Sequence, residues 1–382
     1  MPERSIPLPI APIEAQYRLA IIAGQLVVGG AERQLYLWLS QLDRKKFSPV
    51  VLTLHPGCGD YWEDSVEALD IPLIRIPRRR NRLLRAWEII QALRPYQPHL
   101  IHGWHLFASP YAGLSAKLLG ARSLGSLRGN FQSFSQSTLE RNLTLWLTDG
   151  ILINSASAAE QIQEAWKLRP KRVYTVQNAV KEKLGNRASI RELLSKKFGF
   201  SQEKIWIGSL GRLDPGKRFE ILLQATAWLV EDGCDFHLIL IGDGPERMHL
   251  ERIAAELGLD QRVRFAGEIP EASQWLSALD IFCFTSLDEG NPNAVMEAAA
   301  AGLPIVGWRV GFMEELLKQG EVARLVEPQD LQAFTEALVT LMNSPELRTE
   351  LGLAARQHVL ERFSIPRYVE QMTRVYEDLL AS

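Results

Sequence analysis

With 382 residues, 46% of them hydrophobic and 23% charged, and a formal net charge of −2, the sequence predicts a globular protein of two domains. It excludes a membrane-spanning helix, because no apolar run reaches the roughly 18–20 residues that such a helix requires, and its N-terminal residues lack the pattern of a signal peptide. The three cysteines are widely spaced, which excludes a disulfide framework and a zinc site and predicts reduced thiols in a cytoplasmic protein.

Apolar segments of strand length alternate with helical patterns through the first half of the chain. The first expected strand covers residues 17–24, and a glycine-containing loop and a helix over residues 31–42 follow it. A second helix is expected at residues 83–96, and the further strands at residues 49–55, 71–77, 99–104, 122–128 and 150–155. Buried strands that alternate with helices predict a parallel sheet that is covered on both faces.

The same alternation begins again near residue 185, after a polar segment at residues 181–189 that we interpret as a linker. A strand with its following loop is expected at residues 205–212, and further strands at residues 236–244, 262–269, 280–286 and 303–308. We therefore predict two doubly wound, Rossmann-like α/β lobes, residues 1–182 and 183–364, followed by an amphipathic helix over residues 365–382. Because ligands of open α/β sheets bind at the carboxyl ends of the strands, the expected site lies in a cleft between the lobes.

The strongest chemical signal is the segment 288–298, which joins an expected buried strand to a helix of small residues. Asn293 is expected to cap this helix, whose exposed amide groups favour an anion or sugar oxygens. Glu297 could accept hydrogen bonds from a ribose, and Glu289 could meet a transferred sugar. The alternative is a capped helix whose glutamates are only solvated. The ligand contacts predicted for this segment are Glu289, Gly290, Asn291, Pro292, Asn293, Ala294 and Glu297.

A second signal is the loop 208–218, which follows the first strand of the second lobe. Gly211 allows the backbone to turn tightly, and Arg212 and Lys217 then project from one short loop. An arginine offers a bidentate fork to phosphate and a lysine offers a mobile point charge. Together they could neutralise a diphosphate, whereas the alternative is a pair of surface cations beside a turn.

Three other turns after expected strands carry weaker signals. Gly29 and Gly30 would allow backbone amides to approach a phosphate, although their spacing is not that of a dinucleotide fingerprint. Gly242 and Gly244 shape a strand-to-helix turn beside the expected nucleotide site. Ile269, which ends the next strand, could offer backbone groups to a base.

Polar residues of the first lobe supply candidates for contacts with an acceptor. His102 and His105 follow one strand, where a neutral imidazole could hydrogen-bond a sugar, although structural histidines are more common. Arg128 follows another strand and is predicted to contact the acceptor. The chain contains no Asp-x-Asp triplet that could hold a divalent metal on a diphosphate, so no metal is expected. Arg212 and Lys217 are then needed to neutralise the diphosphate charge.

Charge is distributed unevenly along the chain. Residues 1–180 contain 21 Lys and Arg against 14 Asp and Glu, whereas residues 181–382 contain 22 against 31. Within the basic first lobe, the run 77–85 contains five arginines and opens an expected helix. This run could contact an anionic membrane surface or a phosphorylated acceptor, and the alternative is a solvated basic turn.

Taken in order along almost the whole chain, these motifs resemble retaining glycosyltransferase family 4, whose members have the GT-B fold. The motifs are the glycine pair with Glu32, the Gly211–Lys217 loop, the Gly242–Pro245 turn, the Glu289–Glu297 segment, residues 300–304 and the closing Phe363-Ser364 with its final helix. The resemblance implies that the second lobe binds a nucleotide-diphosphate sugar, and that the terminal helix crosses back to the first lobe.

The resemblance also implies roles for individual residues. Arg212 and Lys217 would hold the diphosphate, Glu297 the ribose hydroxyls, and Glu289 a hydroxyl of the donor sugar. Gly30 would approach the phosphates from the first lobe, and a histidine of that lobe, here His105, would act beside the transferred sugar. Transfer would occur with retention of the anomeric configuration, without a bound metal or another cofactor.

The sequence thus predicts a glycosyltransferase that moves a sugar from a UDP- or GDP-sugar to a sugar or lipid-linked acceptor in glycan, glycolipid or polysaccharide biosynthesis. An epimerase or phosphorylase of the same fold and a catalytically silent nucleotide-sugar-binding protein are the alternatives. A dehydrogenase is disfavoured because the dinucleotide fingerprint is absent. No nucleic-acid partner is expected, and the sequence leaves the acceptor, the donor base, the donor sugar and the oligomeric state open.

Overall fold

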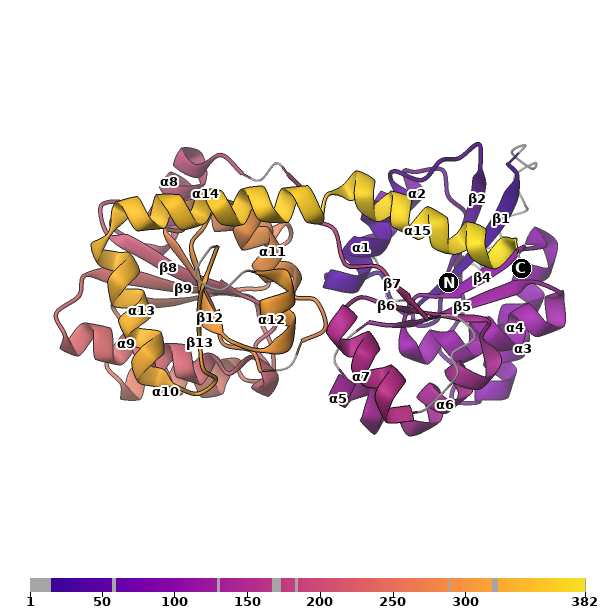
Figure 1. Ribbon diagram of the computed structural model, residues 1–382, viewed down its shortest axis with the longest axis horizontal. Helices are drawn as coiled ribbons and strands as arrows, with labels where there is room; N and C mark the ends of the chain where they lie inside the picture. Colours follow the sequence, from indigo (N-terminus) through magenta and orange to yellow (C-terminus); the bar gives the residue numbers. More distant parts are fainter. Residues whose placement is uncertain are drawn as a thin grey trace, which may run out of the picture. The chain divides into compact units, whose positions relative to one another are not determined.

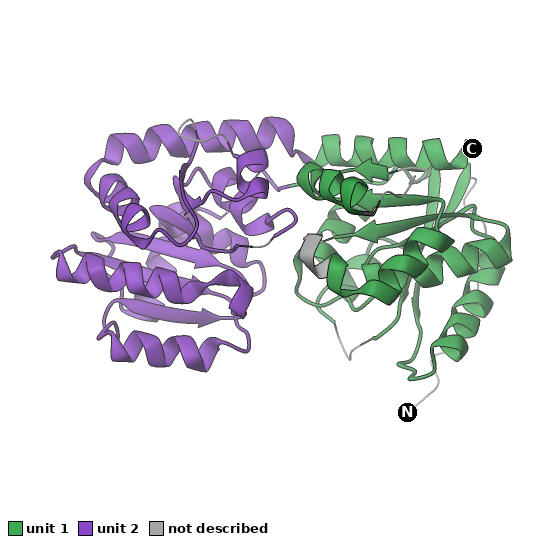
Figure 2. Cartoon of the chain, turned by 60° about the horizontal axis from the view of Figure 1, so that its bottom comes forward, with its two compact units in different colours: residues 1–179, 365–382 green, residues 180–364 purple. Residues whose placement is uncertain are grey.

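The computed structural model describes residues 15–56, 60–128, 131–166, 173–182, 185–287, 289–317 and 322–381. Cys58, Asp288 and part of the expected linker lie outside these residues. The chain forms two compact units, the first of residues 1–179 and 365–382 and the second of residues 180–364 (Figure 2).

Unit 1 contains a parallel sheet whose seven described strands follow the order β3-β2-β1-β4-β5-β6-β7 (Figure 1). The strands are β1 (Tyr17–Ala23), β2 (Phe47–Thr53), β3 (Leu73–Arg75), β4 (Leu100–Gly103), β5 (Arg122–Leu127), β6 (Gly150–Ile153) and β7 (Val173–Thr175). The helices are α1 (Gly30–Leu39), α2 (Glu63–Glu67), α3 (Arg82–Leu93), α4 (Ser109–Leu119), α5 (Phe131–Gln136), α6 (Thr138–Leu147), α7 (Ala156–Trp166) and α15 (Ile365–Leu380).

Unit 2 repeats this plan with six described strands in the order β10-β9-β8-β11-β12-β13. The strands are β8 (Ile205–Leu210), β9 (Phe236–Ile241), β10 (Val263–Gly267), β11 (Ile281–Phe284), β12 (Ile305–Trp308) and β13 (Arg324–Val326). The helices are α8 (Arg187–Phe198), α9 (Phe219–Glu231), α10 (Arg247–Glu256), α11 (Asn293–Ala300), α12 (Gly311–Leu316), α13 (Leu331–Asn343) and α14 (Pro345–Arg362). The predicted fold class, two Rossmann-like lobes, is therefore confirmed.

The linker prediction is wrong in part, because α8 begins inside the segment 181–189. The Asn186 side chain accepts a hydrogen bond from the Ser189 amide at 3.1 Å and caps the first turn of this helix. The chain crosses between the units just before, at Val180, whose amide donates to the Phe363 carbonyl at 2.9 Å. The two crossing segments of the chain therefore lie side by side.

The last helix belongs to the core of unit 1, although unit 2 precedes it in the chain. Its buried side chains recur at helical spacing, so that one face of α15 packs against unit 1; they are Tyr368, Met372, Val375, Tyr376 and Leu379. Tyr376 packs edge-on against Trp38 of α1, with ring centroids 5.3 Å apart.

Residue His102 of β4 is wholly buried under this helix. Its Nδ1 lies 2.7 Å from the Tyr376 hydroxyl, and its Nε2 lies 2.7 Å from Ser126 Oγ. Burial lowers the pKa of His102 well below its ordinary 6.5, and the positive charge of Arg128 acts in the same direction. The imidazole is therefore neutral at pH 7 and serves as a hydrogen-bonded core residue.

The depressed pKa of His102 predicts a specific loss of stability in acid. The unfolded chain binds a proton near pH 6.5 and the folded chain does not, so the free energy of unfolding falls as the pH drops below about 6.5, by up to about 1.4 kcal/mol per pH unit for this residue. Urea unfolding at a series of pH values should show a shallower pH dependence for His102→Gln than for the wild type. Equal slopes would contradict this assignment.

Candidate active site

Each sheet has one point at which its strand order reverses, and open α/β sheets bind ligands outside the carboxyl ends of the strands at such points. In unit 2 this point lies between the adjacent strands β8 and β11, and in unit 1 between β1 and β4. The loops that follow these four strands contain most of the predicted site residues.

Backbone hydrogen bonds join the loop after β8 to the end of β9 and the turn that follows it. The Gly211 amide donates to the Ile241 carbonyl at 3.0 Å, and the Leu213 amide donates to the Asp243 carbonyl at 2.9 Å. Gly242 has a φ of +134°, and a Cβ atom there would stand 2.0 Å from the Gly211 carbonyl oxygen. Two backbone segments thus approach each other where only glycine fits, which fixes the course of the loop that carries Arg212 and Lys217.

Lys217 is held at the end of this loop by polar contacts with the segment after β11. The Thr285 hydroxyl donates to the Lys217 carbonyl at 2.8 Å, and the Ser286 hydroxyl donates to the Gly216 carbonyl at 3.1 Å. The Lys217 ammonium forms an ion pair with the Glu289 carboxylate, and both side chains are about four-fifths buried. The structure therefore brings together one predicted cation and one predicted glutamate at the switch point of unit 2.

Burial lowers the pKa of Lys217, and the Asp214 carboxylate opposes this shift. A partly desolvated ammonium interacts more strongly with a neighbouring anion than a fully hydrated one does. Arg212 lies on the same loop but is exposed, and no described residue forms an ion pair with it. Its guanidinium is therefore open to an incoming anion.

The helix α11 begins at Asn293 and not after it, so Asn293 does not have the capping role that the sequence suggested. Pro292 occupies the cap position, and the amides of Val295 and Met296 donate to its carbonyl at 3.2 and 3.3 Å. The fixed φ of proline suits the entry to a helix. Glu297 lies in the second turn, where it is 6% exposed.

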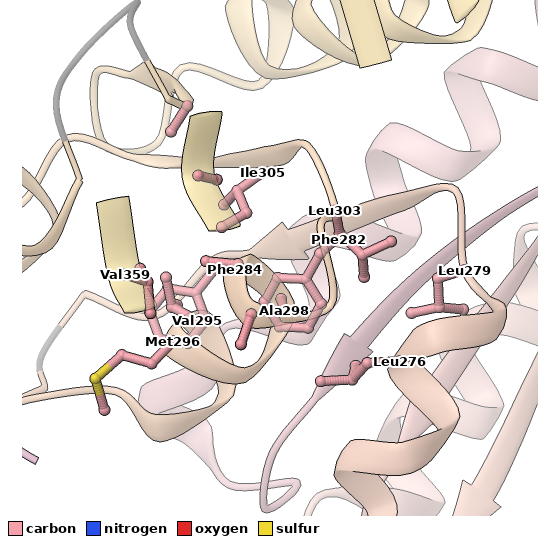
Figure 3. Packing of buried hydrophobic residues seen from close by; sticks show 14 of the residues in the cluster. Leu276, Leu279, Phe282, Phe284, Val295, Met296, Ala298, Leu303, Ile305 and Val359 are labelled. Atoms are coloured by element: carbon pink, nitrogen blue, oxygen red, sulfur yellow. The ribbon is translucent and has the colours of Figure 1, made fainter. Parts of the chain in front are cut away.

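Under this loop and helix lies a dense apolar core that fixes their position. Phe282 and Phe284 of β11 pack with Val295, Met296 and Ala298 of α11 (Figure 3). β11 and α11, which flank the turn with Glu289, Gly290 and Asn291, are therefore both anchored in this core. Ile269, after β10, is half-buried at the border of the same cluster.

A second polar pair lies at the switch point of unit 1. His105, which follows β4, accepts a hydrogen bond at Nδ1 from the Gly24 amide at 3.3 Å, and its Nε2 lies 3.0 Å from Glu32 Oε1. Because Nδ1 accepts, the ring proton lies on Nε2 and is donated to Glu32. A Cβ atom at Gly29 would stand 2.2 Å from Glu32 Oε2, so a side chain there would displace the Glu32 carboxylate from its present position.

The structure contradicts the acceptor-binding role predicted for His102. Strand position alone does not say which face of a strand is covered, and α15 covers the face to which His102 points. Arg128, the other predicted acceptor contact, follows β5 and is half-buried, with its guanidinium carbon 3.8 Å from the centre of the Trp104 ring. Its role toward an acceptor stays a prediction.

Three residues that contact the predicted site residues were not assigned these contacts from the sequence. Thr285 and Ser286 orient the lysine loop, and their position at the end of an expected strand was the available signal. Glu32 was one of the motif residues that carry the family resemblance. Its contact with His105 could not be predicted, because the two residues are 73 positions apart in the chain. No set of three or more His, Cys, Asp or Glu side chains that could hold a metal ion occurs among the described residues, and no described helix has the length and apolarity to cross a membrane.

Comparison with known proteins identifies the family. A family model described as Glycosyltransferase Family 4 matches residues 28–184, and one described as Glycosyl transferases group 1 matches residues 204–344. The lipopolysaccharide core biosynthesis glycosyltransferase LpsE of Rhizobium meliloti is 27% identical over 93% of this chain and 96% of that protein. The N-acetyl-alpha-D-glucosaminyl L-malate synthase of Bacillus anthracis is 29% identical over 55% of each chain, so this chain spans about half of that relative.

Solved structures share the fold at low sequence identity. Anabaena Alr3699/HepE in complex with UDP and glucose has a TM-score of 0.83 at 20% identity, covering 95% of this chain and 100% of that one. Sucrose-phosphate synthase from Thermosynechococcus elongatus has a TM-score of 0.77 at 21% identity, covering 96% and 99%. The two matched regions and the two-unit fold lead to one conclusion: the chain belongs to glycosyltransferase family 4 and has the GT-B fold.

Proposed function

We propose that this protein transfers a sugar from a nucleotide-diphosphate sugar to an acceptor hydroxyl, with retention of the anomeric configuration. The observation that carries the proposal is the junction of Lys217 and Glu289 beside the carboxyl ends of β8 and β11. The donor would be a UDP- or GDP-sugar, and UDP is the first choice because Anabaena Alr3699/HepE was crystallised with UDP and with UDP-glucose. Biosynthesis of a polysaccharide or glycolipid fits the lipopolysaccharide role of the LpsE relative.

Charge complementarity supplies the mechanism. Lys217 and Arg212 would neutralise the diphosphate as the bond between its oxygen and the anomeric carbon breaks. The acceptor oxygen would form its new bond on the face that the leaving group vacates, and its proton would pass to an oxygen of the departing diphosphate. When the donor binds, Glu289 would exchange its contact with Lys217 for a hydroxyl of the donor sugar, and Glu297 would accept hydrogen bonds from the ribose hydroxyls.

A thermal-shift panel of UDP, GDP and their sugars tests the donor. A ligand present at 100 times its Kd stabilises the folded state by about 2.7 kcal/mol, so the correct nucleotide should raise the melting temperature and the wrong base should not. Nucleotide release measured with and without candidate acceptors then tests transfer. Absence of stabilisation by every nucleotide would contradict the proposal. Stabilisation without turnover would indicate a silent binding protein, and donor conversion without an acceptor would indicate an epimerase.

A further inference from the structure

The segment that leads into α3 exposes basic and large apolar side chains together. We define the basic–apolar patch as Arg78, Arg80, Arg82, Leu83, Leu84 and Trp87, all of them exposed. Leu83 is 79% exposed, Trp87 58% and Leu84 43%. Exposed leucines and tryptophans beside one another are unusual on a surface that meets only water.

These apolar side chains are not displaced members of the core. The inner face of α3 is already formed by Ala86, Ile89, Ile90 and Leu93, all of which are buried. Leu83 and Trp87 are four residues apart and therefore share a face of the helix. The helix thus has an apolar inner face toward unit 1 and a second apolar stripe that no described residue covers.

The charges around the stripe are positive and only partly compensated. Arg79, next to the patch, pairs with Glu88 at 3.0 Å, and Arg82 pairs with Glu140 at 3.2 Å. Arg78 and Arg80 form no ion pair with any described residue. The run 77–85 contains five arginines and no acidic residue, so the surface keeps a net positive charge.

The patch is also rigid where it begins. The Asn81 side chain accepts hydrogen bonds from the amides of Leu83 and Leu84 at 2.9 and 3.1 Å, which caps the helix at the first apolar residues. The Arg82–Glu140 ion pair joins this turn to α6, whose Leu139 is 54% exposed. The backbone turn that carries Leu83 and Leu84 is therefore held in place by contacts within unit 1.

We propose that the basic–apolar patch docks unit 1 on the surface of an anionic lipid bilayer. Tryptophan and leucine side chains insert at the level of the headgroups, while arginines beside them contact anionic phosphates. An acidic nucleic acid or peptide would satisfy the arginines, but protruding leucines that form no stacking platform or groove would gain little from it. The proposal does not depend on the donor chemistry, because the patch is tested without a nucleotide sugar.

Sedimentation with vesicles tests the proposal directly. Wild-type protein should pellet with phosphatidylcholine vesicles containing about 30% phosphatidylglycerol, much less with pure phosphatidylcholine, and less at high salt. Two variants separate the contributions: Leu83→Ser with Trp87→Ala removes the apolar stripe, and Arg78→Gln with Arg80→Gln removes the uncompensated charge. Each should weaken the partition to anionic vesicles at least about tenfold.

Matched controls come from unit 2. Trp228 is also exposed, at 42%, but lines a shallow hollow with Asp232 and Glu336, and Arg252 is an exposed arginine paired with Glu256. Trp228→Ala and Arg252→Gln should keep wild-type partition. Failure of the wild type to bind anionic vesicles, unchanged binding by the patch variants, an equal loss in the controls, or binding to an oligonucleotide in place of vesicles would overturn the proposal. An unchanged melting temperature and circular dichroism spectrum would show that each variant folds.

Discussion

Replacing Lys217 with Ala is expected to lower kcat by at least about 10²-fold, because one preorganised charge that stabilises developing negative charge is worth this much or more in an enzyme. Lys217 is the cation that the structure holds at the switch point of unit 2, by contacts from Thr285 and Ser286 to the backbone of its loop. Its side chain is mostly buried, so water that entered after the substitution would stabilise the departing diphosphate less than the ammonium does.

The kinetic measurement is nucleotide release under initial-rate conditions with the donor identified by thermal shift. Lys204→Ala is the matched control. Lys204 precedes β8, at the amino ends of the strands and away from the predicted site, and pairs with Asp235 at 2.7 Å. The control should retain wild-type turnover, and both variants should unfold within a few degrees of the wild type. Near-normal turnover of Lys217→Ala would refute the role assigned to the residue.

Replacing Gly242 with Ala is expected to destabilise unit 2 by about 2–4 kcal/mol and to abolish donor binding. A non-glycine residue at a φ of +134° is strained by about 1–3 kcal/mol. The added methyl group would also lie 2.0 Å from the Gly211 carbonyl oxygen. Because the crowding atoms are backbone atoms of Gly211, they cannot rotate away as a side chain could, and the loop that carries Lys217 would have to shift.

Gly258 provides the control for the backbone conformation alone. It has a φ of +68°, and a Cβ atom there would meet nothing within 4 Å. Gly258→Ala should therefore cost only about 1 kcal/mol and leave donor binding unchanged. Urea unfolding and nucleotide thermal shifts would be measured on both variants. Equal destabilisation of the two would mean that the close approach to Gly211 does not matter.

The sequence was informative wherever the local pattern dictates the structure. The run 236–241 is buried along its whole length in β9, as a strand covered by helices on both faces must be. The order of the motifs identified the family, and the spacing of glycines marked the turns at which two backbone segments meet. The short strands β7 and β13 were not predicted, whereas β3, which also has three residues, lies inside the longer expected strand 71–77.

Contacts between distant residues were decided only by the tertiary structure. His102 and His105 are three positions apart and looked alike in the sequence, yet one is sealed under Tyr376 and the other meets Glu32. Alternate side chains of a strand point to opposite faces of the sheet, and the side chains after its end follow neither face. The surroundings of each histidine therefore depend on which element packs against it.

By itself, then, the amino-acid order determined two α/β lobes, the family and the loops that hold the candidate chemistry, since these follow from periodicity and from motifs that are local. Only the folded chain decided that Lys217 faces Glu289 and that α15 returns to bury His102. Each of these depends on packing between residues far apart in the chain, and no local pattern encodes which partner will cover a given face.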